Sequence, residues 1–367
     1  MTNILLASSL SLILALFGTP LAIRIFKRHR FGQQIREDGP QAHFVKKGTP
    51  TMGGIVIIGG AFIAWIIAHV RVLECFRAVS DPGPVTLRDC VTPFTSSGLL
   101  AMTMIVAMAG LGLIDDYLKV RKQRSLGLNK TSKIIGQVTI ALGFAYLAGI
   151  LETQAQPQVS FVRPLGLDLG MLFFAWVFLI ISAASNGVNL ADGLDGLASG
   201  SAAMVMAAYV IIAFWQVRHP CDPVPASGCY LAPDSLDLAM VAASMLGAAS
   251  GFLWWNAAPA KIFMGDTGSL ALGGAMGALA ILTNTQLLLI VLGGLYVIEV
   301  TSVIVQVISF RLFKRRLFLM APVHHHFELI GWPEFTVIVR FWILAGLSIA
   351  FGLGLFYADF IAQGGID

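Results

Sequence analysis

About ten apolar stretches, each long enough to cross a lipid bilayer, alternate along the chain with short polar segments. A helix needs roughly 20 apolar residues to span about 30 Å of hydrocarbon, and it satisfies its own backbone hydrogen bonds there, which a loop cannot do. The sequence is 57% hydrophobic and only 12% charged, whereas soluble proteins average about a quarter charged residues. We therefore expect an all-α, polytopic integral membrane protein that forms one transmembrane domain over residues 1–367. The expected spans are 3–23, 53–70, 96–114, 134–151, 169–187, 197–217, 236–255, 269–284, 286–310 and 339–358.

The distribution of Lys and Arg predicts the orientation of these spans. With the N-terminus outside, 19 of the 24 Lys and Arg residues fall in inside segments, as the positive-inside rule requires. Both termini are then expected on the periplasmic side. This topology also explains the net charge of +4, so no nucleic-acid partner is needed.

The four cysteines fall in two predicted outside loops. Cys75 and Cys90 lie in one loop, and Cys221 and Cys229 lie in the other. Four cysteines allow three pairings, and an oxidising periplasm favours disulfides. We expect the two local pairs, and the alternative is four unpaired thiols.

Acidic residues gather at the predicted inner ends of the spans. Asp115 and Asp116 follow an apolar run, although a helix C-terminus favours cations, and adjacent carboxylates repel each other unless a cation neutralises them. Asp192 and Asp195 are three positions apart, so a helix would place them on one face. The structural alternative for Asp115 and Asp116 is that they simply end a helix. For Asp192 and Asp195 it is two Asp-Gly turns.

A third acidic site opens the predicted span at 269–284. Asp266, Thr267 and Ser269 resemble the residues that cap a helix N-terminus, and such a terminus also favours phosphate. Carboxylates, phosphate oxygens and water are the ligands that Mg²⁺ prefers, and the neighbouring Lys and Arg residues suit a polyanionic substrate. The inner face is therefore predicted to join a soluble phosphorylated donor to a lipid acceptor, with Asp266 as a metal ligand.

Three other features add candidates. Glycines and prolines fix the backbone near Lys46 and Thr51, where a turn can present N–H groups and a lysine to an anion. Three consecutive histidines at 324–326 cannot all face one metal from a regular helix, so contact with phosphate or proton transfer is favoured over zinc. Glu299 lies within a predicted span, where a carboxylate costs about 2.5 to 3.5 kcal/mol on insertion scales. It is either functional or a helix-packing contact.

At these motifs the sequence resembles the phospho-N-acetylmuramoyl-pentapeptide transferase family, within the polyprenyl-phosphate N-acetylhexosamine-1-phosphate transferase superfamily. The triple-histidine segment is similar to that of the muramoyl-pentapeptide branch, whereas the acidic segments resemble the whole superfamily. The matching stretches are residues 46–54, 115–119, 186–196, 263–269 and 321–328.

The resemblance implies a bacterial inner-membrane enzyme with its active site on five cytoplasmic loops. It implies transfer of phospho-MurNAc-pentapeptide from UDP-MurNAc-pentapeptide to undecaprenyl phosphate, giving lipid I and UMP with Mg²⁺, by a homodimer. Asp266 is then the metal ligand, and Asp115 and Asp116 handle the acceptor phosphate or its proton. The implied catalytic residues also include His325. The implied substrate contacts are Lys46, Thr51, Lys119, Lys130, Asn186, Asn189, Asp192, Asp195, Asn256, Phe263, His324 and His326.

Several alternatives stay open at this point. A sister transferase would use UDP-GlcNAc or another UDP-HexNAc, against which the triple-histidine segment argues. A secondary transporter would carry charges at the bilayer midplane, where only Glu299 is expected. The mechanism is either direct in-line attack by the lipid phosphate or a covalent phospho-aspartyl route.

Overall fold

The protein is a bundle of long helices in a computed structural model, which describes residues 1–29, 31–32, 48–70, 91–122, 126–221 and 227–365. The helices are α1 (Thr2–Arg28), α2 (Gly54–Ala68), α5 (Ser96–Lys122), α6 (Lys130–Ile150), α7 (Leu172–Ala191), α8 (Leu197–Arg218), α9 (Ser235–Asn256), α10 (Gly265–Leu282), α11 (Leu288–Leu292), α12 (Gly294–Phe313), α13 (Val323–Leu329) and α14 (Glu334–Ala362). One hairpin, β1 (Gln158–Ser160) and β2 (Pro164–Asp168), completes the described elements.

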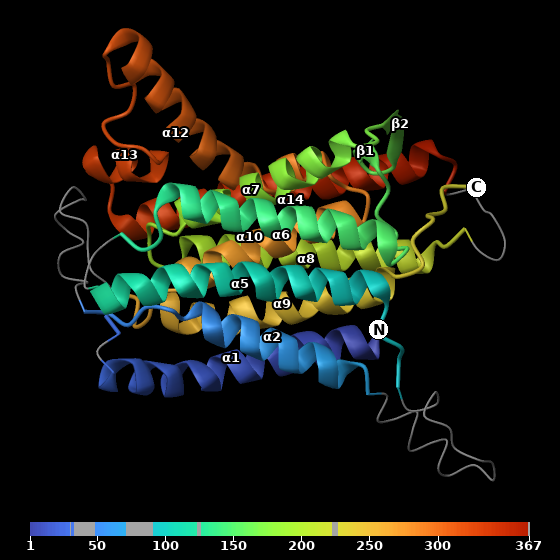
Figure 1. The fold of residues 1–367 in the computed structure, drawn as a ribbon, viewed down its shortest axis with the longest axis horizontal. Helices are drawn as coiled ribbons and strands as arrows, with labels where there is room; N and C mark the ends of the chain where they lie inside the picture. Colours follow the sequence, from blue (N-terminus) through green and yellow to red (C-terminus); the bar gives the residue numbers. More distant parts are fainter. Residues whose placement is uncertain (30, 33–47, 71–90, 123–125, 222–226, 366–367) are drawn as a thin grey trace.

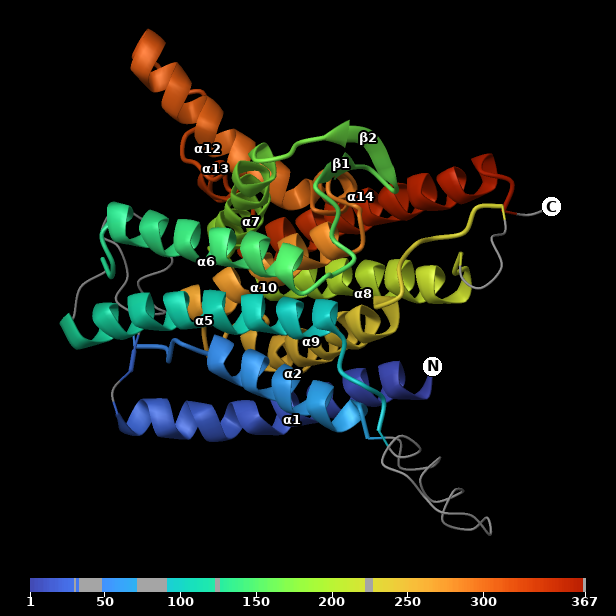
Figure 2. The ribbon, with the colours of Figure 1, turned by 45° about the vertical axis from the view of Figure 1, so that its right-hand side comes forward.

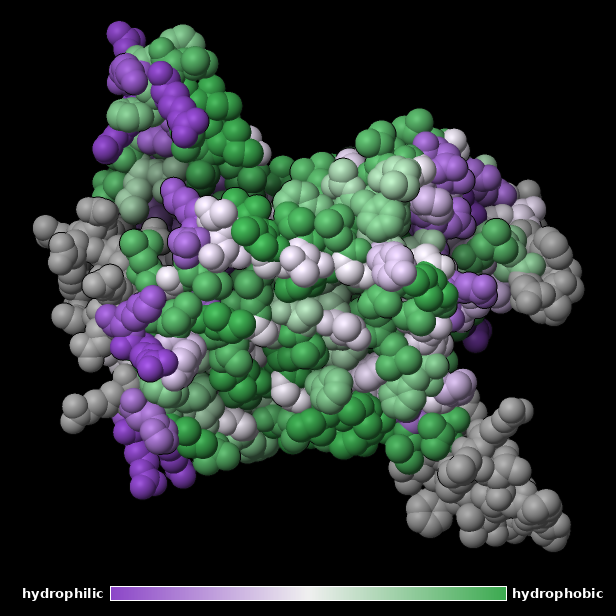
Figure 3. All heavy atoms as spheres, in the orientation of Figure 1, coloured by the Kyte–Doolittle hydropathy of each residue, from purple (hydrophilic) through white to green (hydrophobic). Residues whose placement is uncertain are grey.

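The helices confirm an all-helical polytopic membrane protein. Among the described residues, nine helices are long and apolar enough to cross a membrane, and the shorter α2 is apolar as well. Large apolar side chains such as Phe17, Ile63 and Leu347 point outward and are exposed. Figure 3 shows the resulting apolar surface over the middle of the bundle, with polar groups gathered towards its two ends. An apolar surface of this kind matches a lipid environment.

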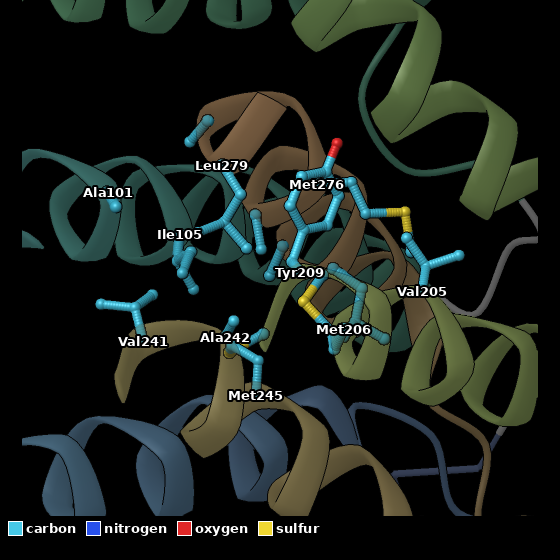
Figure 4. Packing of buried hydrophobic residues seen from close by; sticks show 14 of the residues in the cluster. Ala101, Ile105, Val205, Met206, Tyr209, Val241, Ala242, Met245, Met276 and Leu279 are labelled. Atoms are coloured by element: carbon cyan, nitrogen blue, oxygen red, sulfur yellow. The ribbon is translucent and has the colours of Figure 1, made fainter. Parts of the chain in front are cut away.

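The core lies around α10, which is almost entirely buried. Its small residues let it pack against α5, α7, α8 and α9, as small residues do in membrane bundles. Figure 4 shows Tyr209 and Met206 of α8 beside Met276 of α10, with Ile105 of α5 and Val241 of α9 nearby. The site end of α10 is therefore held on several sides.

The helices continue further towards the predicted inner face than the apolar runs do. α5 ends at Lys122, so Asp115, which the expected span 96–114 leaves outside, lies on the helix. α7 ends at Ala191, which places Asn189 on a helix too. α10 begins at Gly265 rather than 269. Basic residues in the last turn of α5 favour this extension because they complement the helix dipole.

The expected span at 286–310 is divided. Gly293 separates the short α11 from α12, and α12 leans away from the bundle at the end where α13 lies (Figures 1 and 2). α1 begins and α14 ends at the opposite end of the bundle (Figure 1). We call the end that carries α13 the site end.

The opposite end carries a disulfide. Cys221 and Cys229 form a disulfide, which confirms one expected pair, whereas Cys75 and Cys90 lie outside the described residues. The segment 152–168, between two expected spans, contains the antiparallel β1–β2 hairpin. Arg163 in this hairpin donates to the carbonyl of Cys229 at 2.5 Å and to Asp359 of α14 at 2.8 Å. These contacts join three outer segments.

Candidate active site

Three carboxylates converge at the site end. Asp115 and Asp116 lie near the C-terminus of α5, and Asp266 lies in the first turn of α10. One carboxylate oxygen from each of the three lies within 4.8 Å of the other two. α5 approaches this closely because Gly112 lies against the backbone of Asp266, where a Cβ atom would overlap it. Helices that are far apart in sequence thus place like charges together.

Two lysines compensate this negative charge. The Nζ atom of Lys119 lies 2.6 Å from Asp115, 3.1 Å from Asp266 and 3.4 Å from Asp116. Lys133 of α6 contacts the other oxygen of Asp266. Asp115 and Asp116 are each only 2% exposed, so the attraction is little screened by water. Adjacent carboxylates are expected to need a neutralising cation, and these lysines supply part of that positive charge.

The N-terminus of α10 is capped from another helix. The expectation that Asp266, Thr267 and Ser269 cap it is wrong, because Met264 holds the cap position and makes no side-chain cap bond. Instead, Asp116 accepts hydrogen bonds from the backbone N–H groups of Asp266 and Thr267 and from the Thr267 hydroxyl, at 3.1, 2.9 and 2.8 Å. These N–H groups have no partner within their own helix. Asp116 thus fixes α5 to α10.

We expect Asp116→Asn to lower the free energy of unfolding by about 1–2 kcal/mol, the range for loss of a helix cap or of a buried acceptor. The amide keeps one acceptor oxygen but presents N–H groups to donors. Chemical unfolding in detergent micelles measures the change. Thr267→Val removes only one of the three hydrogen bonds and should cost less. Equal unfolding of wild type and Asp116→Asn would contradict the capping role.

The end of α7 reaches the carboxylates through an amide. Asn189 donates to Asp266 at 2.9 Å and to the Ser269 hydroxyl at 2.8 Å. Asn186, one turn earlier, donates to Gln137 of α6 at 3.2 Å. The structure therefore places Asn189 at the carboxylates and Asn186 at the contact between α6 and α7.

Asp192 and Asp195 follow the end of α7. They do not share a helical face as expected, because the chain turns there and reaches the left-handed Gly196, with φ of 82°. The pKa of Asp192 is raised well above its usual value, mainly by burial of its carboxyl and further by the negative charges of Asp266 and Asp116. Asp192 therefore belongs electrostatically to the same site.

Two predicted contact residues shape the loop at 257–262. Asp195 accepts a hydrogen bond from the backbone N–H of Ala260 at 2.8 Å. Asn256 accepts one from the Ser199 hydroxyl at 2.7 Å and donates to the carbonyl of Ile262 at 3.0 Å. Both side chains are buried. They hold the loop in place, and direct contact with substrate stays a prediction.

The segment after this loop pairs with the chain before α2. The N–H of Phe263 donates to the carbonyl of Pro50 at 2.8 Å, and the N–H of Gly53 donates to the carbonyl of Phe263 at 2.9 Å. The Phe263 side chain is half-buried, and Thr51 is buried. Both segments thus meet at the start of α10, while Lys46 lies outside the described residues.

The three histidines have three different partners. His324 is fully buried, whereas His325 and His326 on the same short helix α13 are half-buried. The ring nitrogens lie 3.0, 2.7 and 3.2 Å from their partners, which are Glu299, Glu328 and the backbone N–H of Leu319. The three rings therefore point to different neighbours, and contact with phosphate or proton transfer stays a prediction. Glu299 contacts the histidine segment, as the helix-packing alternative expects, and a functional role for it stays a prediction.

Comparison with known proteins agrees with this geometry. Residues 98–284 match glycosyl transferase family 4, and residues 46–58 match phospho-N-acetylmuramoyl-pentapeptide-transferase signature 1. A phospho-N-acetylmuramoyl-pentapeptide-transferase of Frankia casuarinae is 52% identical over 100% of both chains. The chain belongs to the phospho-N-acetylmuramoyl-pentapeptide-transferase family. Further members from Saccharopolyspora erythraea and Mycobacterium leprae are 48% and 47% identical, each over 99% of this chain and over 98% and 99% of their own.

The two matched regions contain most of the residues of the candidate site. The glycosyl transferase match runs from the start of α5 to just beyond α10 and so includes all three carboxylates. The phospho-N-acetylmuramoyl-pentapeptide-transferase signature ends inside α2, and its described part contains Thr51 and the pairing with Phe263. The protein is therefore a multi-pass enzyme of the bacterial cytoplasmic membrane.

The structure also shows which lysine of the α5–α6 region reaches the carboxylates in this transferase. Lys130 is exposed at the start of α6, whereas Lys133, not chosen from the sequence, contacts Asp266. The cap residue Asn129, whose side chain accepts from the backbone N–H of Ser132, fixes where α6 begins. With that start known, Lys133 is one turn further along the helix. Lys133 could therefore have been predicted from the sequence only if the start of α6 had been placed correctly.

Proposed function

We infer that the chain catalyses the transfer of phospho-MurNAc-pentapeptide from UDP-MurNAc-pentapeptide to undecaprenyl phosphate, giving lipid I and UMP in peptidoglycan synthesis. The observation that carries this is the cluster of Asp115, Asp116 and Asp266 with Lys119, at the end of a bundle of membrane-spanning helices. Such a site can meet a soluble nucleotide from one side and a lipid from the other. Identity of 52% to a transferase over its full length supports the same reaction.

The three carboxylates fit Mg²⁺. They offer hard oxygen ligands within 4.8 Å of one another, and Mg²⁺ is commonly held by one or two carboxylates together with phosphate oxygens and water. We propose Asp266 as the principal ligand, since Asp116 is engaged by the N-terminus of α10. When bound, the ion would neutralise charge on the phosphate oxygens.

The lysines and Asp115 act on the phosphoryl groups. Lys119 and Lys133 place two positive charges at Asp266, where they can stabilise charge on the transferred group. Asp115 is the carboxylate that remains for the acceptor phosphate or its proton. Because that phosphate is already ionised near neutral pH, direct in-line attack is favoured over a phospho-aspartyl intermediate. Isotope exchange between UMP and donor in a lipid-free preparation would favour the covalent route instead.

The nucleotide side is formed by the segments around Phe263. We propose that Phe263 stacks on uracil, with Asn186, Asn189, Asp192, Asp195 and Asn256 forming or supporting the pocket. Lys46, Thr51, Lys130, His324, His325 and His326 are proposed to contact or support the anionic groups. Support comes from the loop contacts that bring residues 50–53 to Phe263 and the chain at Asp195 to Ala260.

The lipid side is proposed to lie along α12. Val297, Ile304 and Ile308 share one helical face and are 39%, 51% and 48% exposed, so they can line the path of a prenyl chain. We also propose a homodimer, for which other exposed apolar helix faces provide surface.

The donor substrate is the sharpest test of the reaction. Purified protein is incubated with undecaprenyl phosphate, Mg²⁺ and either UDP-MurNAc-pentapeptide or UDP-GlcNAc, and UMP is measured. Release with UDP-MurNAc-pentapeptide alone is the expected result. Release only with UDP-GlcNAc would make the protein a sister transferase and overturn the proposal.

A further inference from the structure

Glu299 and His324 form a buried pair between α12 and α13. Both side chains are fully buried, and Nδ1 of His324 lies 3.0 Å from Oε1 of Glu299. A carboxylate is costly inside a bundle unless a partner offsets the cost. The one ion-pair partner of Glu299 in the described chain is this imidazole.

A second contact joins the same two helices. The Ser302 hydroxyl, one turn beyond Glu299, donates to the carbonyl of Glu299 at 2.7 Å and accepts from the backbone N–H of Val323 at 3.0 Å. The first turn of α13 is therefore held to α12 by adjacent side chains. This arrangement leaves His324 little freedom to rotate.

The opposite edge of the imidazole faces the turn after α7. A Cβ atom at Gly193 would overlap Nε2 of His324 and would lie 3.2 Å from Nε2 of His325. Within the part of the chain that the structure describes, neither ring nitrogen of His324 and neither carboxylate oxygen of Glu299 makes a hydrogen bond. The 3.0 Å approach of Nδ1 to Oε1 is therefore an electrostatic contact. His324 thus lies between Glu299 and the turn that carries Asp192 and Asp195, and His325 lies over the same glycine.

We propose that Glu299 is a positioning residue for the transfer reaction. Its carboxylate lies 3.0 Å from Nδ1 of His324 and so restrains the ring electrostatically, as a carboxylate fixes the orientation and tautomer of a histidine elsewhere. The ring in turn holds α13 against Gly193, with His325 directed at the substrate side of that turn. This inference rests on the proposed function, in which His325 contacts an anionic group of the substrate.

Two near-isosteric variants separate the polar contact from packing. Glu299→Met keeps the volume and removes both carboxylate oxygens, and Glu299→Gln keeps a polar oxygen that can face Nδ1. We expect Glu299→Met to lower kcat about 10- to 100-fold, the range for loss of a histidine-orienting partner, with KM for undecaprenyl phosphate unchanged. Glu299→Gln should recover most of the lost turnover. Wild-type kcat in Glu299→Met, or equal loss in both variants, would overturn the proposal.

Gln306 provides a matched control on the same helix. Its side chain makes hydrogen bonds to the backbone of Leu317 and Phe318, which do not involve His324, and so holds the α12–α13 connection. Gln306→Met should therefore leave kcat near wild type. If it lowers kcat as much as Glu299→Met, a loosened connection explains both losses, and the positioning role of Glu299 is wrong.

A spectroscopic measurement separates this inference from the proposed function. The ¹⁵N resonances of His324 are recorded in bilayers without substrate and assigned by their loss in His324→Gln. We expect the Nδ1 resonance to move in Glu299→Met and to stay in Gln306→Met. An unchanged resonance in Glu299→Met would overturn the pairing even if the wild-type protein is active, whereas failure of the wild type to release UMP would refute only the proposed reaction.

Discussion

Replacing Asp266 by Asn is expected to lower kcat by about 100-fold or more while the helix bundle stays folded. Asp266 is the carboxylate that meets Lys119, Lys133 and Asn189 at once. A metal ion at such a site contributes several kcal/mol to transition-state stabilisation, and each 1.36 kcal/mol is a tenfold change in rate. An amide oxygen is neutral and a weaker ligand, so this contribution is largely lost.

The fold should tolerate this change because the cap of α10 uses the backbone N–H of residue 266, and its side chain takes no part in the cap. UMP release measures the loss of activity, and thermal unfolding in detergent checks the fold. Asp168→Asn is the matched control, since Asp168 is an exposed aspartate at the opposite end of the molecule. Wild-type turnover by Asp266→Asn would remove Asp266 from the metal site.

The membrane architecture could be predicted because it depends on the length of apolar runs. Each of the ten expected spans contains helix, and the span 286–310 contains two. Nine helices of the described chain are long and apolar enough to cross a membrane. The ends of the helices could not be predicted in the same way. Hydropathy falls where the bilayer ends, whereas hydrogen bonding continues, so α5 carries Asp115, Asp116 and Lys119 on its last turns. The acidic residues expected just beyond this span therefore lie on the helix.

The pairings within the site depend on tertiary structure. Asp116 and Thr267 are 151 residues apart in sequence, and nothing local shows that one caps the helix of the other. The cost of a carboxylate inside a membrane marks Glu299 in the sequence, but its contact with His324 depends on how α13 packs against α12. Residue type identified the chemical groups, and packing assigned their partners.

Replacing Lys119 by Met is expected to lower the unfolding temperature in EDTA and to make it strongly dependent on Mg²⁺. The ammonium lies within 3.4 Å of all three carboxylates, and removal of one partner of a buried ion pair costs about 3–5 kcal/mol. The cost should be nearer about 2–3 kcal/mol here, because Lys119 is 29% exposed and solvent screens exposed charges. Lys133 also continues to neutralise Asp266.

Mg²⁺ should restore much of this stability, since a ligand that binds only the folded state stabilises it by RT ln(1 + [L]/Kd). The restored protein should still turn over slowly, because the lysine charge that assists phosphoryl transfer is missing. Lys122→Met, an exposed lysine at the end of the same helix, should show neither effect. A Lys119→Met protein that unfolds like wild type in EDTA, or that gains no stability from Mg²⁺, would contradict the view that lysine and metal stabilise one carboxylate cluster.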